Sequence, residues 1–129
     1  MFKFENNKIY WMPAHFGGDI YDPSKELYYR DVVSVTYICT TDGERLANYL
    51  PEGFELIRPE LIIAYTQCRE VEWMAGSGYN VIEVSAPVRF HGQRDRVDGQ
   101  FALVVWENKT EPILGGREQT GIPKIYADI

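Results

Sequence analysis

Two apolar stretches decide the fold, ELIIAYTQC at residues 60–68 and YNVIEVSAPVRF at residues 79–90. Both are rich in β-branched and aromatic residues, which pack well on a pleated surface, and this composition predicts two strands. The Gly-Ser-Gly at residues 76–78 predicts a turn between them. We therefore expect the two strands to pair in one sheet.

Two further stretches extend this sheet. The run DVVSVTYICT at residues 31–40 predicts a strand whose one face carries Val33, Val35, Tyr37 and Cys39. The nearly unbroken apolar run QFALVVW at residues 100–106 predicts a strand covered on both faces, and Asp98-Gly99 before it predicts a hairpin turn. Residues 1–28 mix prolines, glycines and aromatics, which predicts an irregular arm that includes one short strand.

Two segments predict short helices. The first begins at Thr41, which precedes Glu44 at the spacing of a capping box, and ends at Pro51. The second spans residues 111–121 and is stopped by Gly121 and the proline that follows it. Mostly strands with two short helices predict an α+β fold built on an antiparallel β-sheet or a β-barrel-like sheet.

Composition limits the classes of function. A chain of 129 residues with 45% apolar and 25% charged residues predicts a single domain, residues 1–129. The net charge of −6 disfavours nucleic acid as a partner, and the apolar runs are far shorter than the ~20 residues that cross a membrane. The N-terminus lacks the pattern of a secretory signal, so we expect a cytoplasmic location, with Cys39 and Cys68 as free, half-buried thiols.

The sequence contains no common motif for a zinc site, a phosphate-binding loop or a serine nucleophile. His15 and His91 lack further ligands at zinc-site spacing, so no metal is expected. The Gly-Ser-Gly turn lacks the lysine and hydroxyl residue of a phosphate-binding loop, and there is no G-x-S-x-G sequence. We expect no cofactor.

One segment is more specific: EPILGGREQTGIPK at residues 111–124. It resembles the acetoacetate decarboxylase family, in which a similar E-P and G-R-E segment precedes a proline and a lysine. The matching residues are Glu111, Pro112, Ile113, Gly116, Arg117, Glu118, Gly121, Pro123 and Lys124. YRDVVSVTYICTTDGERLANYLPEGFEL at residues 29–56 and GSGYNVIEVSAPVRFHG at residues 76–92 are similar to other parts of the family.

The resemblance implies a particular architecture. It identifies the chain as the N-terminal half of an acetoacetate decarboxylase-like fold, a partial β-cone with short helices. In the family, strands from the second half close the cone around the lysine. Because open strand edges invite association, we expect a homo-oligomer or a second chain that completes the barrel.

The family's functional residues fall on four positions. Its Schiff-base lysine falls on Lys124 and its active-site arginine on Arg30. The position of its active-site glutamate holds Val81, and Glu83 is on the same strand face and is the candidate replacement. Ile125 stands where the second lysine of acetoacetate decarboxylases is found.

The resemblance implies a lysine Schiff-base lyase that decarboxylates a small keto acid, or processes it by aldol-type chemistry. The alternative is a non-catalytic member that binds a small ligand, or an inactive fragment of the same fold. Arg30 would hold the substrate carboxylate and Glu83 would move protons. Arg30 is equally compatible with a surface arginine at the start of a strand.

A Schiff-base lysine must attack as the neutral amine, so its surroundings must disfavour the ammonium, and acetoacetate decarboxylases are a known case of such activation. The neighbours Ile122 and Ile125 are expected to desolvate Lys124 and to line the substrate site. Arg117 and Glu118 are further candidate substrate-binding residues, or they form ion pairs that support the lysine segment. Without the resemblance, a lysine after a helix would be a solvated residue near the C-terminal carbonyls.

Overall fold

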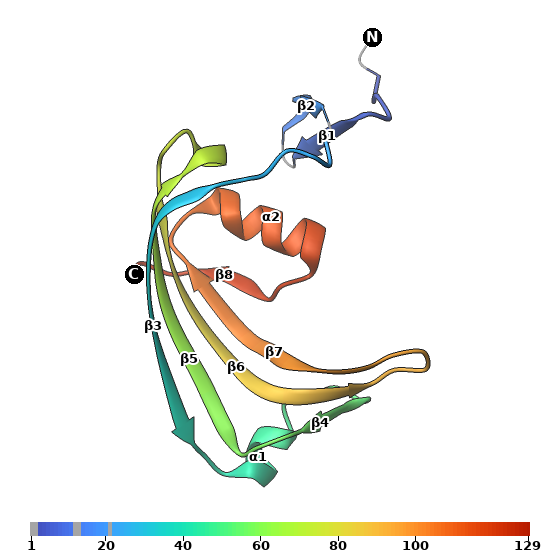
Figure 1. Ribbon diagram of the computed structural model, residues 1–129, viewed down its shortest axis with the longest axis vertical. Helices are drawn as coiled ribbons and strands as arrows, with labels where there is room; N and C mark the ends of the chain where they lie inside the picture. The colour runs from blue at the N-terminus through green and yellow to red at the C-terminus, as the bar shows by residue number, and fades with distance from the viewer. Residues whose placement is uncertain (1–2, 12–13, 21) are drawn as a thin grey trace.

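One curved, six-stranded sheet organises the chain in the computed structural model, which describes residues 3–11, 14–20 and 22–129 (Figure 1). Its strands are β3 (Tyr29–Thr40), β4 (Phe54–Leu56), β5 (Glu60–Val71), β6 (Tyr79–His91), β7 (Arg96–Glu107) and β8 (Lys124–Tyr126). They lie in the order β3-β5-β6-β7-β8, with β4 paired to β6. All pairs are antiparallel except β7 with β8, which is parallel. The predicted open antiparallel sheet with short helices is confirmed.

The N-terminal arm contains two strands where the sequence predicted one. β1 (Lys8–Trp11) and β2 (Ala14–Ile20) pair antiparallel as a separate two-stranded sheet. A strand leaves backbone donors and acceptors that need partners, so a second strand beside the first satisfies them.

The predicted strands at residues 60–68 and 79–90 are confirmed as β5 and β6, which pair with each other. The connection between them includes a 3₁₀ turn, η1 (Glu72–Met74), followed by Ala75 and Gly76 at φ 54° and 79°. Gly78 completes the turn, because a Cβ there would lie 2.2 Å from the Cys68 carbonyl oxygen. The predicted Gly-Ser-Gly turn is therefore correct.

The hairpin between β6 and β7 turns earlier than predicted. Its tight turn lies at residues 92–95, where the Gly92 N–H donates to the Asp95 carbonyl at 2.9 Å. The prediction of a turn at Asp98-Gly99 was wrong, because Asp98 lies within β7 and forms an ion pair with Arg89 of β6 at 2.6 Å. Cross-strand pairing overrode the local turn preference.

Both predicted helices are present. α1 (Gly43–Ala47) is shorter than predicted and is capped by Asp42, which accepts from the Arg45 N–H at 3.1 Å, so the capping box at Thr41 was wrong. α2 (Thr110–Thr120) ends at Gly121, whose left-handed φ of 67° provides the C-cap that the sequence predicted. None of the described helices has the length and apolarity to cross a bilayer.

Two small clusters form the buried core. Leu46 of α1 packs with Ala86 and Val88 of β6 at one end of the sheet. Residues of β5 and β6 form the second cluster, which consists of Cys68, Val71 and Tyr79. α1 and β4 lie toward one end of the sheet, and α2 and β8 lie toward the other (Figure 1).

Both cysteines are free thiols, as the sequence predicted. Cys68 is buried, but Cys39 is exposed on β3 and was wrongly expected to be half-buried. β3 is an outer strand whose side chains are exposed, including Val35 at 43%, Tyr37 at 63% and Ile38 at 64%. Among the described residues, β5 is the only strand that pairs with β3.

Candidate functional site

Lys124 begins β8, and its side chain enters the space between the sheet and α2. The side chain is only 13% exposed. Its Nζ lies 2.8 Å from Oε1 of Glu107 and donates to the Pro112 carbonyl of α2 at 3.1 Å. Lys124 is therefore a half-buried, ion-paired lysine, not a solvated residue at the C-terminal end of the helix.

Gly116 makes room for this lysine. A Cβ at Gly116 would lie 2.4 Å from Cε and 2.8 Å from Nζ of Lys124. The lysine side chain thus runs directly against the backbone of α2. Its own backbone is held in place because β8 pairs with β7, with Lys124 opposite Val105.

Glu107 is the group that contacts the amine. It ends β7, and strand alternation puts it on the same face as Val105 and Lys124. It is 1% exposed, and its Oε2 has no hydrogen-bond partner among the described residues. Burial raises the pKa of Glu107, whereas the hydrogen bond and charge of Lys124 act in the opposite direction.

Two further titratable groups of the sheet lie on the same face as this pair. Cys68 of β5 and Tyr79 of β6 belong to the buried cluster on this face. Burial raises the pKa of the Cys68 thiol, and burial together with a hydrogen bond to Tyr29 raises the pKa of the Tyr79 phenol. Both groups stay neutral at pH 7, so Lys124 supplies the positive charge beside Glu107.

The structure puts Val81 and Glu83 on the predicted face. Val81 lies directly opposite Glu107, and Glu83 lies opposite Val105, which in turn lies opposite Lys124. Glu83 is thus two strands away from the lysine, and its side chain forms no hydrogen bond or ion pair within the described part of the chain. The carboxylate beside the amine comes from Glu107, next to Val81 on the neighbouring strand.

Arg30 is not brought next to Lys124 in this chain. Its side chain is 53% exposed on the outer strand β3, 3.8 Å from Glu72, and its guanidinium lies 4.9 Å from the centre of the Tyr28 ring. Following the paired residues across the sheet from Lys124 leads to Thr36 on β3. Arg30 lies six residues before Thr36 on that strand, so it is not opposite the lysine. Its role as a carboxylate ligand stays a prediction.

The two isoleucines differ in position. Ile125 is 46% exposed, and alternation along β8 points it away from the face of Lys124, so the expectation that it desolvates the amine was wrong. Ile122 is half-buried and, with Pro123, lines a cavity of about 360 Å³ beside β7. Gly116 of α2, together with the sheet, covers the lysine instead.

Arg117 supports the lysine segment. Its Nη1 donates to the Lys124 carbonyl at 3.0 Å, which agrees with a structural role. Glu118 is exposed on α2. Substrate contacts of these two residues stay predictions.

Sequence reasoning missed Glu107. The available signal was its place at the end of the apolar run that predicted a strand covered on both faces. A carboxylate in a covered strand must find a partner, since a buried, unpaired charge is strongly unfavourable. The sequence alone does not identify Lys124 as the partner of Glu107, because the two strands that bring them together, β7 and β8, are separated in sequence by α2.

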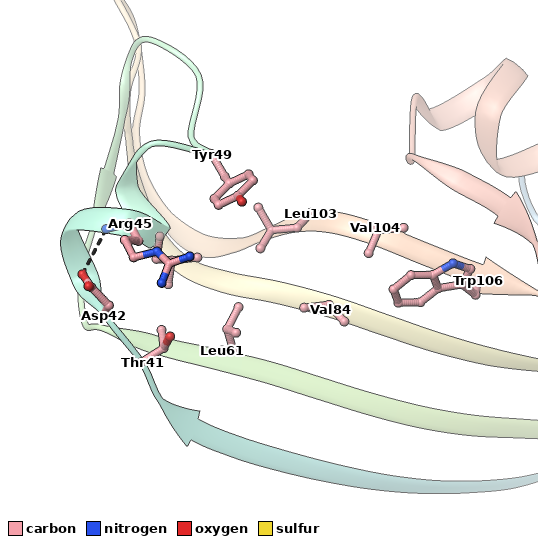
Figure 2. Close-up of a pocket in the computed structure, with 10 residues that line it drawn as sticks. Thr41, Asp42, Arg45, Tyr49, Leu61, Val84, Leu103, Val104 and Trp106 are labelled. Atoms are coloured by element: carbon pink, nitrogen blue, oxygen red, sulfur yellow. Dashed lines mark hydrogen bonds between the residues drawn. The ribbon is translucent and has the colours of Figure 1, made fainter.

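A larger cavity than the one beside Ile122 lies elsewhere. It measures about 520 Å³ and lies over the sheet beside α1 (Figure 2). In Figure 2, Arg45 and Tyr49 face Leu103 and Trp106 across it. Lys124 is not among its lining residues.

One protein family matches most of this chain. The family described as acetoacetate decarboxylase (ADC) matches residues 12–129. An acetoacetate decarboxylase of Burkholderia vietnamiensis (strain G4 / LMG 22486) is 32% identical over 98 residues, which are 76% of this chain and 37% of that protein. The chain thus spans little more than a third of the length of this relative.

Solved structures agree with the sequence match. An acetoacetate decarboxylase from Legionella pneumophila subsp. pneumophila str. Philadelphia 1 superposes with a TM-score of 0.68 at 22% identity, covering 88% of this chain and 44% of that chain. An acetoacetate decarboxylase-like enzyme from Sphingomonas wittichii RW1 gives 0.57 at 25% identity, covering 74% and 39%. The chain belongs to the acetoacetate decarboxylase family.

Proposed function

We propose that the chain carries the nucleophilic lysine of a Schiff-base lyase that acts on a small keto acid. The observation behind this proposal is the amine of the half-buried Lys124, 2.8 Å from the buried carboxylate of Glu107. A lysine withdrawn from water and given a proton acceptor is suited to attack a carbonyl carbon. Membership of the family supports the same chemistry.

In the proposed reaction, the Lys124 amine adds to the ketone, and loss of water gives an iminium. The iminium accepts the electron pair that remains when a β-carboxylate leaves as carbon dioxide, or when a proton leaves the α-carbon. Decarboxylation and aldol-type processing share this intermediate. Arg30 and Glu83 are candidates for binding the carboxylate and moving protons once the site is complete.

We propose that further protein completes the substrate pocket, either additional sequence of a longer chain or a second copy. Three facts support this. The chain spans 37% of a curated relative, the outer strand β3 has a free edge in the described structure, and Lys124 lines neither of the two cavities described above. The pocket would then form where this sheet meets the added strands.

A second candidate function is binding of a small ligand without catalysis. Two observations favour it: the amine of Lys124 is engaged in an ion pair with Glu107, and the cavity of about 520 Å³ lies against α1, away from this lysine. A protein of this kind would bind its ligand reversibly and form no covalent adduct.

Reductive trapping distinguishes the two functions. The protein is incubated with acetoacetate or pyruvate and cyanoborohydride, and the modified lysine is located by mass spectrometry. The lyase proposal predicts an adduct on Lys124 that is lost in Lys124→Arg and kept in Lys109→Arg, whose lysine is exposed. Absence of an adduct on Lys124, with reversible ligand binding, would favour the binding protein.

A further inference from the structure

Resting on the proposed function, we propose that Glu107 is the acid–base residue of imine formation and carries, one at a time, the two protons that this reaction moves from nitrogen to oxygen. It is the only carboxylate within ion-pair distance of Nζ in the described part of the chain. No motif in the sequence predicted a role for this residue.

The geometry of the carboxylate supports this role. Oε1 lies 2.8 Å from the Lys124 Nζ, close enough for direct proton transfer. Oε2 is buried and lacks a donor among the described residues, although buried carboxylate oxygens normally have one. A hydroxyl group formed on the substrate carbon would supply the missing donor at Oε2, while Oε1 keeps its contact with the nitrogen.

The steps balance with two protons, which the carboxylate carries from nitrogen to oxygen one at a time. The resting pair of ammonium and carboxylate exchanges its proton to give the neutral amine and the carboxylic acid. The amine nitrogen bonds to the ketone carbon, the C=O electron pair moves to oxygen, and the acid protonates that oxygen. The regenerated carboxylate then removes a proton from nitrogen. It returns this proton as the C–O bond breaks, so water leaves and a C=N iminium forms beside the carboxylate.

This sequence keeps the buried charge constant. The resting state has one ammonium and one carboxylate, and the product has one iminium and one carboxylate. No uncompensated charge is left beside the buried Glu107, where a lone charge would be strongly unfavourable. A neutral residue at position 107 would leave the iminium unpaired.

The neighbouring groups are poor substitutes for Glu107. Titratable groups on the same face are the Glu83 carboxylate, which is two strands away from Lys124, the Cys68 thiol and the Tyr79 phenol. Burial raises the pKa of the thiol and of the phenol. From α2, the polar contact to the amine is the Pro112 carbonyl, which cannot take up a proton. The charged residues of α2, Glu111, Arg117 and Glu118, are exposed.

Two reactions of the same lysine test the proposal. Reductive trapping with acetoacetate needs the free amine and also the loss of water. Acetylation by acetic anhydride needs only the free amine, and Lys109 provides an internal reference. Both rates are measured at pH 7 for the wild type, Glu107→Gln and the control Glu52→Gln, an exposed residue in the loop before β4.

Glu107→Gln is expected to slow trapping at Lys124 by about 100-fold, the usual scale of general acid–base catalysis. Acetylation should stay at least as fast as in the wild type, because the ammonium has lost its carboxylate partner. Glu52→Gln should change neither rate. If Glu107→Gln does not fold, Glu107→Asp replaces it and should slow trapping without slowing acetylation.

The outcomes separate this proposal from the proposed function. An adduct that forms equally fast in the wild type and in Glu107→Gln would overturn the role of Glu107 and leave the lyase function standing. A parallel fall of trapping and acetylation would show that Glu107 only positions the lysine, which also overturns the role. No adduct in the wild type would overturn the lyase function and this role together.

Discussion

Replacing Gly116 by alanine tests whether the Lys124 side chain needs the space that the absent Cβ of Gly116 leaves beside α2. The added Cβ would lie 2.4 Å from Cε, 2.5 Å from Cδ and 2.8 Å from Nζ of Lys124. Helix backbone cannot retreat from the sheet without disrupting α2, but the lysine side chain is flexible. We therefore expect the chain to fold with Lys124 displaced and its ion pair to Glu107 broken.

The size of the effect follows from two opposing contributions. Breaking a buried ion pair while one partner stays buried costs about 3 kcal/mol at the lower end of measured cases. This value applies to the Lys124–Glu107 pair, because the lysine side chain is only 13% exposed and the glutamate side chain 2%. Alanine in a helix interior is more favourable than glycine by about 1 kcal/mol. The free energy of unfolding should therefore fall by about 2 kcal/mol.

Urea unfolding and reductive trapping measure the two consequences. Gly116→Ala should lower the free energy of unfolding and reduce the adduct on Lys124 at least ~10-fold. The control is Gly99→Ala in β7, where an added Cβ meets nothing within 4 Å. An increase in stability of about 1 kcal/mol with unchanged trapping would match helix propensity alone and refute the reasoning.

Three further predictions concern the ion pair and the outer strand. Lys124→Met should destabilise the fold by about 3 kcal/mol in urea unfolding, and adding Glu107→Leu should recover most of that loss, because it removes the unpaired carboxylate; equal stability of the single and double variants would contradict this. Since burial raises the pKa of Glu107, its contribution to stability is present below about pH 4.5 and is lost as pH rises through the raised value. The melting temperature of the wild type minus that of Glu107→Gln should thus fall from pH 4 to pH 8, and a rise would mean that the sign is wrong. The wild type should self-associate through its exposed β3 edge, and Val35→Lys should shift it to monomer in size-exclusion chromatography; a monomeric wild type would argue against association.

The strands and α2 could be predicted because their signals are local. β-Branched runs, the glycine turn before Tyr79 and the glycine after α2 each act within a few residues. The hairpin turn was misplaced because Asp98-Gly99 has the local preference of a turn, while cross-strand pairing to Arg89 fixes it inside β7. Local preference is weaker than a long register of paired residues.

The candidate site was predicted in part for a similar reason. Lys124 was predicted from its motif, but its contact with Glu107 was not. The two residues come together because β7 and β8, which are separated in sequence by α2, pair in parallel. Ile125 adjoins Lys124 in sequence, yet alternation along a strand sends it to the other face. Adjacency in sequence therefore misidentified what surrounds the amine.

The most direct test of the central claim is the distribution of reduced keto-acid adduct over the five lysines. Reactivity governed by exposure would place Lys124, which is 13% exposed, behind Lys8, which is 30% exposed. If Lys124 forms the imine, peptide mapping after reduction at pH 7 will find most of the adduct on this half-buried residue. Adduct spread over the exposed lysines, with Lys124 modified least, would contradict the account.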